Sequence, residues 1–212
     1  MTEKLNIALI GCGSWGKNIA RNLHKIGTLA CIYDTDQNLL QKLNQNFNLP
    51  TYSINDIFKN EKIQALVIAS AAKTHKDLAE EALLNNKDVF IEKPFCLSLS
   101  DATNLSKLAI KKNRVLMVGH LLNYHNAFIK MKDLIKEGKI GKIKNIRAHR
   151  LALGAIRSHE SVVYDLAAHD ISMILSITQE LPVEISAHSI HHNSNIGPDA
   201  ISVKLSFKAG TT

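Results

Sequence analysis

The glycine turn at residues 11–16, which reads GCGSWG, constrains the fold of this chain more than any other segment. The apolar run Leu5–Ile10 precedes it, and apolar residues recur at helical spacing from Ser14 to Ile26. A second apolar run, Leu29–Tyr33, leads into Asp34, which lies 18 residues beyond the last glycine of the turn. Glycines spaced in this way between a strand and a helix, with an acidic residue after the next strand, are typical of a turn that binds a dinucleotide.

Each glycine of this turn has a physical reason for its position. Gly11 permits the tight turn, Gly13 lets the backbone approach a pyrophosphate, and Gly16 lets the helix pack closely on the sheet. The N-terminus of the helix would offer free N–H groups and a partial positive charge to the phosphates. Asp34 can accept hydrogen bonds from both ribose hydroxyls, and its charge would repel a 2′-phosphate, which favours NAD over NADP. The alternative is that the glycines form only a simple turn between strand and helix.

The first 120 residues alternate short apolar runs with longer amphipathic ones. Helices are expected between the apolar runs, with Thr74 as a cap for one and a capping box from Ser98 to Asp101 at the start of another. Six strands separated by helices predict an α/β domain, a doubly wound Rossmann fold with a parallel sheet, over residues 1–120. The expected strands are Leu5–Ile10, Leu29–Tyr33, a short one around Tyr52, Ala65–Ala69, Val89–Ile91 and Val115–Gly119.

Residues 121–212 follow a different pattern, which predicts a second domain of the α+β class. Phe207–Thr212 is typical of a strand that enters a hairpin turn, and the sequence stops there, so we expect an incomplete sheet with an unpaired edge. The expected helices are Ala127–Glu137 and Val162–Ile177, and the expected extended segments are Ile143–Leu153, Pro182–His192 and Ile201–Phe207.

Lys93 stands in the tripeptide Glu92-Lys93-Pro94, directly after the fifth expected strand. Ligands of open α/β sheets bind beyond the carboxyl ends of the strands, so we expect Lys93 to lie in the cleft. Pro94 biases the preceding residue away from helical conformation, which could project the ammonium group into the site. There it could donate or accept a proton, or hold a substrate hydroxyl. The alternative is a solvated surface lysine.

His169 is the second candidate for acid–base chemistry. Asp165 lies four residues earlier, on the same face of the expected helix, and can orient and tune a histidine near neutral pH. The alternative is a histidine that serves only packing. No metal site is expected at the histidines of the following strand and turn, His188, His191 and His192, because they have no acidic or cysteine partner at a suitable spacing.

Composition and charge exclude several classes of protein. Hydrophobic residues make up 45% and charged residues 21%, as in ordinary globular proteins, and no apolar run reaches the ~18 residues of a membrane span. Three cysteines without metal-type spacing and no signal-peptide pattern favour the cytoplasm. The net charge of +7 includes eight basic residues between Lys130 and Arg150, without interleaved aromatics, which argues against a nucleic-acid partner. This basic stretch is either a solvated face or a positive field near an anionic substrate.

Together these motifs resemble those of the GFO/IDH/MocA oxidoreductase family. The resemblance rests on the glycine turn, the Glu92-Lys93-Pro94 tripeptide and the histidine on a later helix. It covers essentially the whole chain. Residues 11–18 (GCGSWGKN), 119–125 (GHLLNYH), 150–157 (RLALGAIR) and 165–171 (DLAAHDI) are similar to a subgroup of nucleotide-sugar dehydrogenases.

The resemblance implies a role for individual residues. It places Lys93 next to the nicotinamide and the reacting hydroxyl, His169 across the substrate, and Asp165 beside the substrate, as the catalytic residues. The implied substrate-binding residues are Asn123, Tyr124, Arg157, Asp165 and His169. The implied cofactor-binding residues are Gly11, Gly13, Ser14, Trp15, Gly16, Asp34, Ala71, His75, Glu92 and Lys93.

The resemblance also implies an activity and an assembly. The activity is NAD-dependent oxidation of a sugar ring hydroxyl, at C3 of a UDP-sugar acid, in polysaccharide biosynthesis. The second domain would carry a large, open, mostly antiparallel sheet, through which the protein would form a homo-oligomer, a dimer or a tetramer, with no membrane partner.

Two departures from the family pattern bear on these expectations. Tyr164 and Ala168 replace the usual tryptophan and proline around the Asp–His motif. Family members are also considerably longer, so the chain is expected to be a fragment or a C-terminally truncated form. The alternatives are an inositol or free-sugar dehydrogenase of the same family, or a truncated NAD-binding protein without catalysis.

Overall fold

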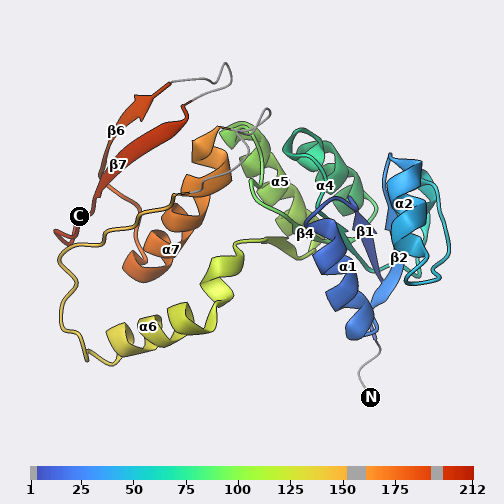
Figure 1. The fold of residues 1–212 in the computed structure, drawn as a ribbon, viewed down its shortest axis with the longest axis horizontal. Helices are drawn as coiled ribbons and strands as arrows, with labels where there is room; N and C mark the ends of the chain where they lie inside the picture. Colours follow the sequence, from blue (N-terminus) through green and yellow to red (C-terminus); the bar gives the residue numbers. More distant parts are fainter. Residues whose placement is uncertain (1–3, 152–160, 192–197) are drawn as a thin grey trace. The chain divides into compact units, whose positions relative to one another are not determined.

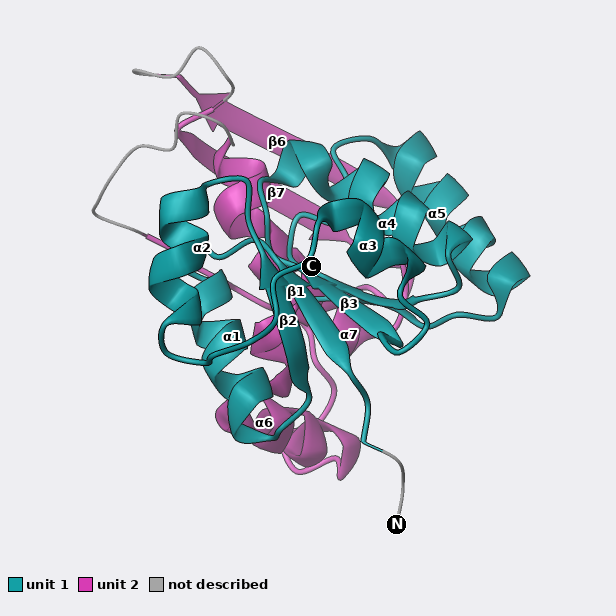
Figure 2. Ribbon diagram, turned by 90° about the vertical axis from the view of Figure 1, so that its right-hand side faces the viewer, with its two compact units in different colours: residues 1–119 teal, residues 120–212 magenta. Residues whose placement is uncertain are grey.

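The structure, a computed structural model, describes residues 4–151, 161–191 and 198–212. Contacts between Cα atoms divide the chain into unit 1, Met1–Gly119, and unit 2, His120–Thr212. Figure 1 traces the elements along the chain, and Figure 2 colours the two units separately.

Unit 1 is built on a parallel sheet of five strands in the order β2-β1-β3-β4-β5. The order reverses direction at β1, so that the chain first winds to one side of β1 and then to the other, as in a doubly wound fold. The expectation of a Rossmann fold is therefore confirmed. The strands are β1 (Ile7–Ile10), β2 (Leu29–Tyr33), β3 (Ala65–Ile68), β4 (Asp88–Ile91) and β5 (Leu116–Val118).

Helices cover both faces of this sheet. Figure 2 shows α1 (Gly16–Lys25) and α2 (Gln37–Asn44) on one side, and α3 (Ile54–Lys59), α4 (His75–Leu84) and α5 (Leu99–Lys112) on the other. Alternate residues of a strand point to opposite faces of the sheet, so the strands contribute side chains to a hydrophobic core on each face. Leu9, Ile32 and Val67 pack on the side of α1 and α2, whereas Ala8, Leu66 and Ile91 pack on the other.

The prediction of a short strand around Tyr52 is wrong. Residues 51–53 form no strand, and Ser53 instead caps α3, its hydroxyl accepting a hydrogen bond from the Asp56 N–H at 3.2 Å. The single apolar side chain of this segment is exposed, so no burial favours a sixth strand. The expected cap of α5 is confirmed at Ser98, whose hydroxyl accepts from the Asp101 N–H at 3.1 Å and donates to the Asp101 carboxylate at 2.7 Å. Thr74 does not cap α4; its hydroxyl donates to the Ala71 carbonyl instead.

Unit 2 contains fewer elements. After a 3₁₀ turn at Leu121–Tyr124, labelled η2, comes α6 (Asn126–Lys136). A π-helical turn, η3 (Val163–Ala167), runs directly into α7 (Ala168–Thr178), and the antiparallel strands β6 (Glu184–Ile190) and β7 (Ala200–Ser206) follow. The helices among the described residues are too short or too polar to cross a bilayer.

The incomplete antiparallel sheet expected in unit 2 is confirmed, and the described residues form two strands of it. Residues 143–151 belong to no strand, although Ile146 N–H donates to the Thr212 carbonyl and Thr212 N–H donates to the Lys144 carbonyl. The hairpin turn expected after β7 is confirmed, since Phe207 N–H donates to the Thr211 carbonyl at 3.0 Å. The backbone of Thr212 thus pairs with residues 144–146.

Close backbone packing at the glycine turn explains two of its glycines. Gly11 has φ of +98°, and a Cβ there would lie 2.5 Å from the carbonyl carbon of Ala69. A Cβ on Gly16 would collide with the carbonyl oxygen of Gly11. A Cβ on Gly13, by contrast, would meet no atom within 4 Å. Gly11 and Gly16 are therefore required by the fold, and Gly13 is not.

This contrast generates a stability prediction. Gly11→Ala should lower the free energy of unfolding by roughly 2–4 kcal/mol, because it adds both a backbone clash and an unfavourable φ. Gly13→Ala is the matched control and should stay within about 1 kcal/mol of the unsubstituted chain. Urea unfolding followed by the fluorescence of Trp15, the single tryptophan of the chain, measures both. Equal stabilities for the two variants would contradict the structural role of Gly11.

Candidate functional site

The glycine turn lies at the carboxyl end of β1, where it opens α1. The helix begins at Gly16, its first basic residue is Lys17, and Ser14 and Trp15 are exposed at its start. The first N–H groups of a helix have no partner within the helix, and together with the helix dipole they attract anions. The open space beside Gly13 leaves room for such an anion against the backbone.

Asp34 is held at the end of β2 by two backbone donors. Its Oδ2 accepts a hydrogen bond from the Cys12 N–H at 2.6 Å, and its Oδ1 accepts one from the Asp36 N–H at 2.9 Å. The first bond ties the carboxylate to the glycine turn across 22 residues of sequence. Each carboxylate oxygen can accept more than one hydrogen bond, so acceptor capacity remains for a pair of hydroxyls.

Glu92 lies beyond the end of β4, in contact with the same turn. The indole Nε1 of Trp15 donates to Glu92 Oε1 at 2.8 Å. On the other side, a Cβ on Gly119 would lie 3.0 Å from the carboxyl group. Burial raises the pKa of Glu92, and the hydrogen bonds from Trp15 and from the Lys93 backbone, together with the charge of Lys93, oppose this rise. The carboxylate of Glu92 is thus oriented by the Trp15 indole and packed against Gly119.

Lys93 follows Glu92 and joins Pro94 through a cis peptide bond. Ala71 is exposed at the end of β3 and begins the 3₁₀ turn η1 (Ala72–Thr74). His75, the first residue of α4, is 1% exposed. A contact of His75 with the cofactor stays a prediction, and in the structure its buried ring lies between the Ser70 and Pro94 carbonyls.

In unit 1 the structure therefore brings together most of the residues expected to bind a cofactor. The glycine turn, Asp34 and Glu92 are linked by hydrogen bonds at the carboxyl edge of the sheet. The pairing of Trp15 with Glu92 had no signal in the sequence, because it joins residues 77 positions apart.

In unit 2, the residues expected to act on the substrate lie on η2, η3 and the start of α7. Asp165 lies within the π turn, in which the Ala168 N–H donates to the Val163 carbonyl five residues earlier. Such turns are frequent at functional sites. His169 follows on the first turn of α7, which packs against η2. Arg157 lies outside the described residues.

Two polar atoms of η2 and its preceding residue are buried without a hydrogen-bond partner among the described residues. They are Nδ1 of His120 and Oδ1 of Asn123. Burial also lowers the pKa of His120. Tyr124, beside them, is 61% exposed. A buried polar group without a partner is unfavourable, so these two atoms are suited to meet a polar ligand. The sequence analysis missed His120.

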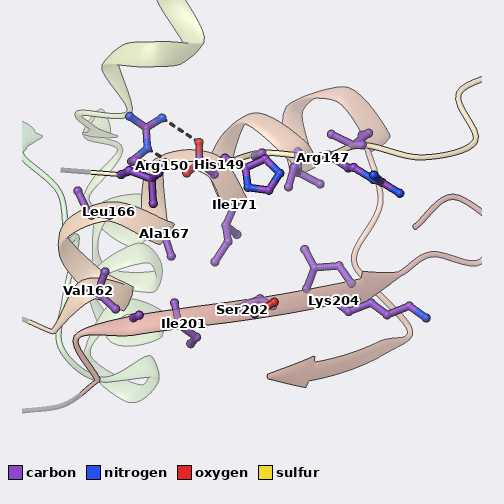
Figure 3. Close-up of a pocket in the computed structure, with 18 of the residues that line it drawn as sticks. Arg147, His149, Arg150, Val162, Leu166, Ala167, Ile171, Ile201, Ser202 and Lys204 are labelled. Atoms are coloured by element: carbon purple, nitrogen blue, oxygen red, sulfur yellow. Dashed lines mark hydrogen bonds and ion pairs between the residues drawn. The ribbon is translucent and has the colours of Figure 1, made fainter. Parts of the chain in front are cut away.

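A cavity of about 840 Å³ lies elsewhere in unit 2, between residues 145–151, the η3–α7 segment and β7 (Figure 3). Arg150 donates to Asp170 through Nε at 2.9 Å and through its terminal nitrogen at 2.8 Å, as the dashed lines in Figure 3 show. Arg150 belongs to the basic stretch Lys130–Arg150, for which the sequence predicts either a solvated face or a positive field near a substrate. In the structure its charge is paired with Asp170 in a half-buried ion pair. Asp165 and His169 do not line this cavity.

No group of three histidine, cysteine, aspartate or glutamate side chains among residues 4–151, 161–191 and 198–212 is arranged to hold a metal ion.

Comparisons with known proteins identify both units. The profile of the GFO/IDH/MocA oxidoreductase family with an NAD-binding Rossmann fold matches residues 5–120. The profile of the GFO/IDH/MocA C-terminal domain matches residues 128–212.

Several curated proteins are similar to the chain. A 2,7-anhydro-N-acetylneuraminate hydratase of Escherichia coli is 30% identical over 69% of this chain and 40% of its own length. A UDP-N-acetylglucosamine 3-dehydrogenase of Acidithiobacillus ferrooxidans is 27% identical over 86% of this chain and 57% of its own. A myo-inositol 2-dehydrogenase of Thermotoga maritima is 27% identical over 97% and 66%.

The solved structure of the A. ferrooxidans enzyme shares the fold, with a TM-score of 0.88 and 24% identity over 99% of this chain and 68% of that one. The matched regions thus span about 40% to two-thirds of these proteins.

The site also generates a prediction about its cysteines. Burial raises the pKa of the Cys12 thiol, in the glycine turn, and of the Cys31 thiol to about 12, with the charge of Asp34 adding to the effect at Cys12. Because the thiolate is the reactive form, iodoacetamide at pH 8 should label both at least ~100-fold more slowly in the folded chain than in urea. Half-buried Cys96, whose pKa is also raised by burial, should react first. Peptide mass spectrometry measures each rate, and early labelling of Cys12 would contradict its burial.

Proposed function

Because the chain belongs to the GFO/IDH/MocA oxidoreductase family, we propose that it oxidises a ring hydroxyl of a nucleotide-linked sugar, at C3 of a UDP-sugar acid, with NAD as the hydride acceptor. Support for the substrate class comes from the similarity to a UDP-N-acetylglucosamine 3-dehydrogenase along 86% of the chain. The net charge of +7 is compatible with an anionic substrate of this kind.

The fit of unit 1 to NAD carries the proposal. The glycine turn leaves open space at Gly13 in front of the N-terminus of α1, which suits a pyrophosphate. Asp34 is fixed by the Cys12 and Asp36 N–H groups while it retains acceptor capacity for the two ribose hydroxyls. The coenzyme site would be completed by Ser14 and Trp15 at the start of α1, and by Ala71 and Glu92 beyond the ends of β3 and β4.

The chemistry is divided between coenzyme and protein. Bound NAD supplies the hydride acceptor, at C4 of its nicotinamide. We assign Lys93 Nζ to the substrate hydroxyl, whose proton it receives as the hydride leaves the carbon. His169 orients the hydroxyl or exchanges its proton, and Asp165 orients His169 from the preceding turn. Asn123, Tyr124 and Arg157 hold the sugar and its acidic group.

One alternative substrate class is favoured by an observation. The similarity to a myo-inositol 2-dehydrogenase extends over 97% of the chain, so free polyols are the rival substrates. A UDP-sugar acid and a set of free polyols, each assayed with NAD by absorbance of the reduced nicotinamide, separate the two classes. A second alternative is NAD binding without catalysis. It is motivated by the length of the chain, which spans 57% of the curated A. ferrooxidans enzyme and 68% of its solved structure. Calorimetry that shows NAD binding, together with no turnover of either substrate class, would favour it.

Location and assembly belong to the same proposal. The three cysteines are free, which is compatible with the reducing cytoplasm. The strands of unit 2 expose apolar side chains, among them Ile185 at 64% and Ile190 at 51%, and association through this sheet as a dimer or a tetramer would cover them.

The position of Asp34 generates a prediction about coenzyme choice. Asp34→Asn should weaken NAD binding and strengthen NADP binding, because it removes the charge that repels a 2′-phosphate and keeps one oxygen acceptor. We expect the ratio of the two dissociation constants to shift by at least ~10-fold towards NADP. Quenching of Trp15 fluorescence measures both constants. Asp36→Asn, which removes an equal charge two residues away at the cap of α2, should leave the ratio unchanged. An unchanged ratio in Asp34→Asn would refute its contact with the ribose.

The role of Lys93 generates a second prediction. Lys93→Met should lower kcat by ~10²- to 10⁴-fold, the range of a lost proton acceptor, while the Kd for NAD stays within about threefold. Lys111→Met, on the exposed last turn of α5, is the control of equal charge and should leave kcat unchanged. Turnover of Lys93→Met at the rate of the unsubstituted protein would remove this lysine from the mechanism.

A further inference from the structure

His75 is a histidine whose two ring nitrogens both face backbone oxygens. The side chain is 1% exposed, Nδ1 lies 2.8 Å from the Pro94 carbonyl oxygen, and Nε2 lies 3.1 Å from the Ser70 carbonyl oxygen. A carbonyl oxygen can only accept a hydrogen bond, and a neutral imidazole carries a single N–H, so the neutral ring donates to one of the two carbonyls at a time. The shorter contact joins Nδ1 to the Pro94 carbonyl oxygen. A buried donor that loses its partner is costly, so this contact restrains the Pro94 carbonyl.

The two carbonyls belong to two different turns at the carboxyl edge of the sheet. Ser70 follows β3, and Pro94 follows β4 after the cis peptide bond to Lys93. His75 itself is fixed, because it opens α4 and the residue before it is anchored. The Thr74 hydroxyl lies 2.7 Å from the Ser70 hydroxyl and donates to the Ala71 carbonyl at 2.8 Å. The ring therefore joins a rigid helix start to the peptide that follows Lys93.

We propose that His75 is the positioning residue for Lys93: by holding the Pro94 carbonyl against the start of α4, it fixes the backbone from which Lys93 Nζ reaches the substrate. The proposal rests on the proposed function of Lys93. With a ring that is only 1% exposed, His75 would act on Lys93 through the Pro94 carbonyl and not by its own contact with the substrate. A misplacement of a catalytic group by about 1 Å can lower the rate ~100-fold, so a residue beneath the site can control turnover.

The first experiment compares three variants in steady-state kinetics, expressed per folded protein. His75→Phe fills a similar space but cannot donate, and kcat should fall ~100-fold while the Kd for NAD stays within about threefold. His75→Gln keeps a donor amide and should recover part of the loss, to about tenfold below the unsubstituted protein. Leu83→Ala, at a fully buried position of the same helix without polar contacts, controls for general destabilisation and should keep kcat. A kcat of His75→Phe within threefold of the unsubstituted protein would overturn the proposal, as would an equal loss in Leu83→Ala.

The second experiment does not depend on activity. Cys96 lies two residues after Pro94 and packs, half-buried, against the core beside α4, so its alkylation rate reports on opening of this turn. His75→Phe should raise the rate of iodoacetamide labelling of Cys96 at least ~10-fold, and Leu83→Ala should not. Equal rates in His75→Phe and the unsubstituted chain would show that His75 does not hold the turn.

The two experiments separate the two proposals. If the unsubstituted protein shows no turnover with any sugar, the proposed function fails. The labelling of Cys96 then still decides whether His75 restrains the Lys93–Pro94 turn.

Discussion

The structure depends on the close approach of two backbone segments at the carboxyl edge of the sheet. Gly11 lies so near the peptide between Ala69 and Ser70 that a Cβ would not fit, and a Cβ on Gly16 would likewise collide with the Gly11 carbonyl. These two close approaches place the glycine turn against the ends of β1 and β3, and α1 begins at the last glycine of the turn. The N-terminus of that helix, and with it any anion site, is therefore placed by backbone sterics before a ligand contributes.

Polar groups along the same edge are paired across strands. Cys12 N–H bonds to Asp34, the Trp15 indole bonds to Glu92, and His75 meets the carbonyls of Ser70 and Pro94. Each of these contacts satisfies a polar group that would otherwise be costly, and each joins segments far apart in the sequence. The interactions that stabilise this edge are thus the ones that orient the proposed coenzyme and proton-transfer groups, so fold stability and site geometry are coupled.

Unit 2 is held together by different means. Its helix α7 is apolar in composition, yet no residue of it is fully buried. A sheet of two strands offers little surface for an apolar helix to pack against, and isolated hairpins are marginally stable. The bidentate pair of Arg150 and Asp170 and the packing of α7 on η2 are among the contacts that hold α7 in this unit. The site expected on η2 and α7 therefore lies on a less buried scaffold than the one in unit 1.

The amino-acid sequence by itself determined the local features of this protein: the strand–turn–helix of GCGSWG, the acid at Asp34, the helix cap at Ser98 and the hairpin turn after β7. Each depends on residues close together in the chain, where conformational preference and hydrogen-bonding chemistry act directly. Only the tertiary structure decided that the segment around Tyr52 is not a strand, that Trp15 pairs with Glu92, and that the ring of His75 is buried between the Ser70 and Pro94 carbonyls. These outcomes depend on burial and on partners many residues away, and neither is specified by the spacing of residues along the chain.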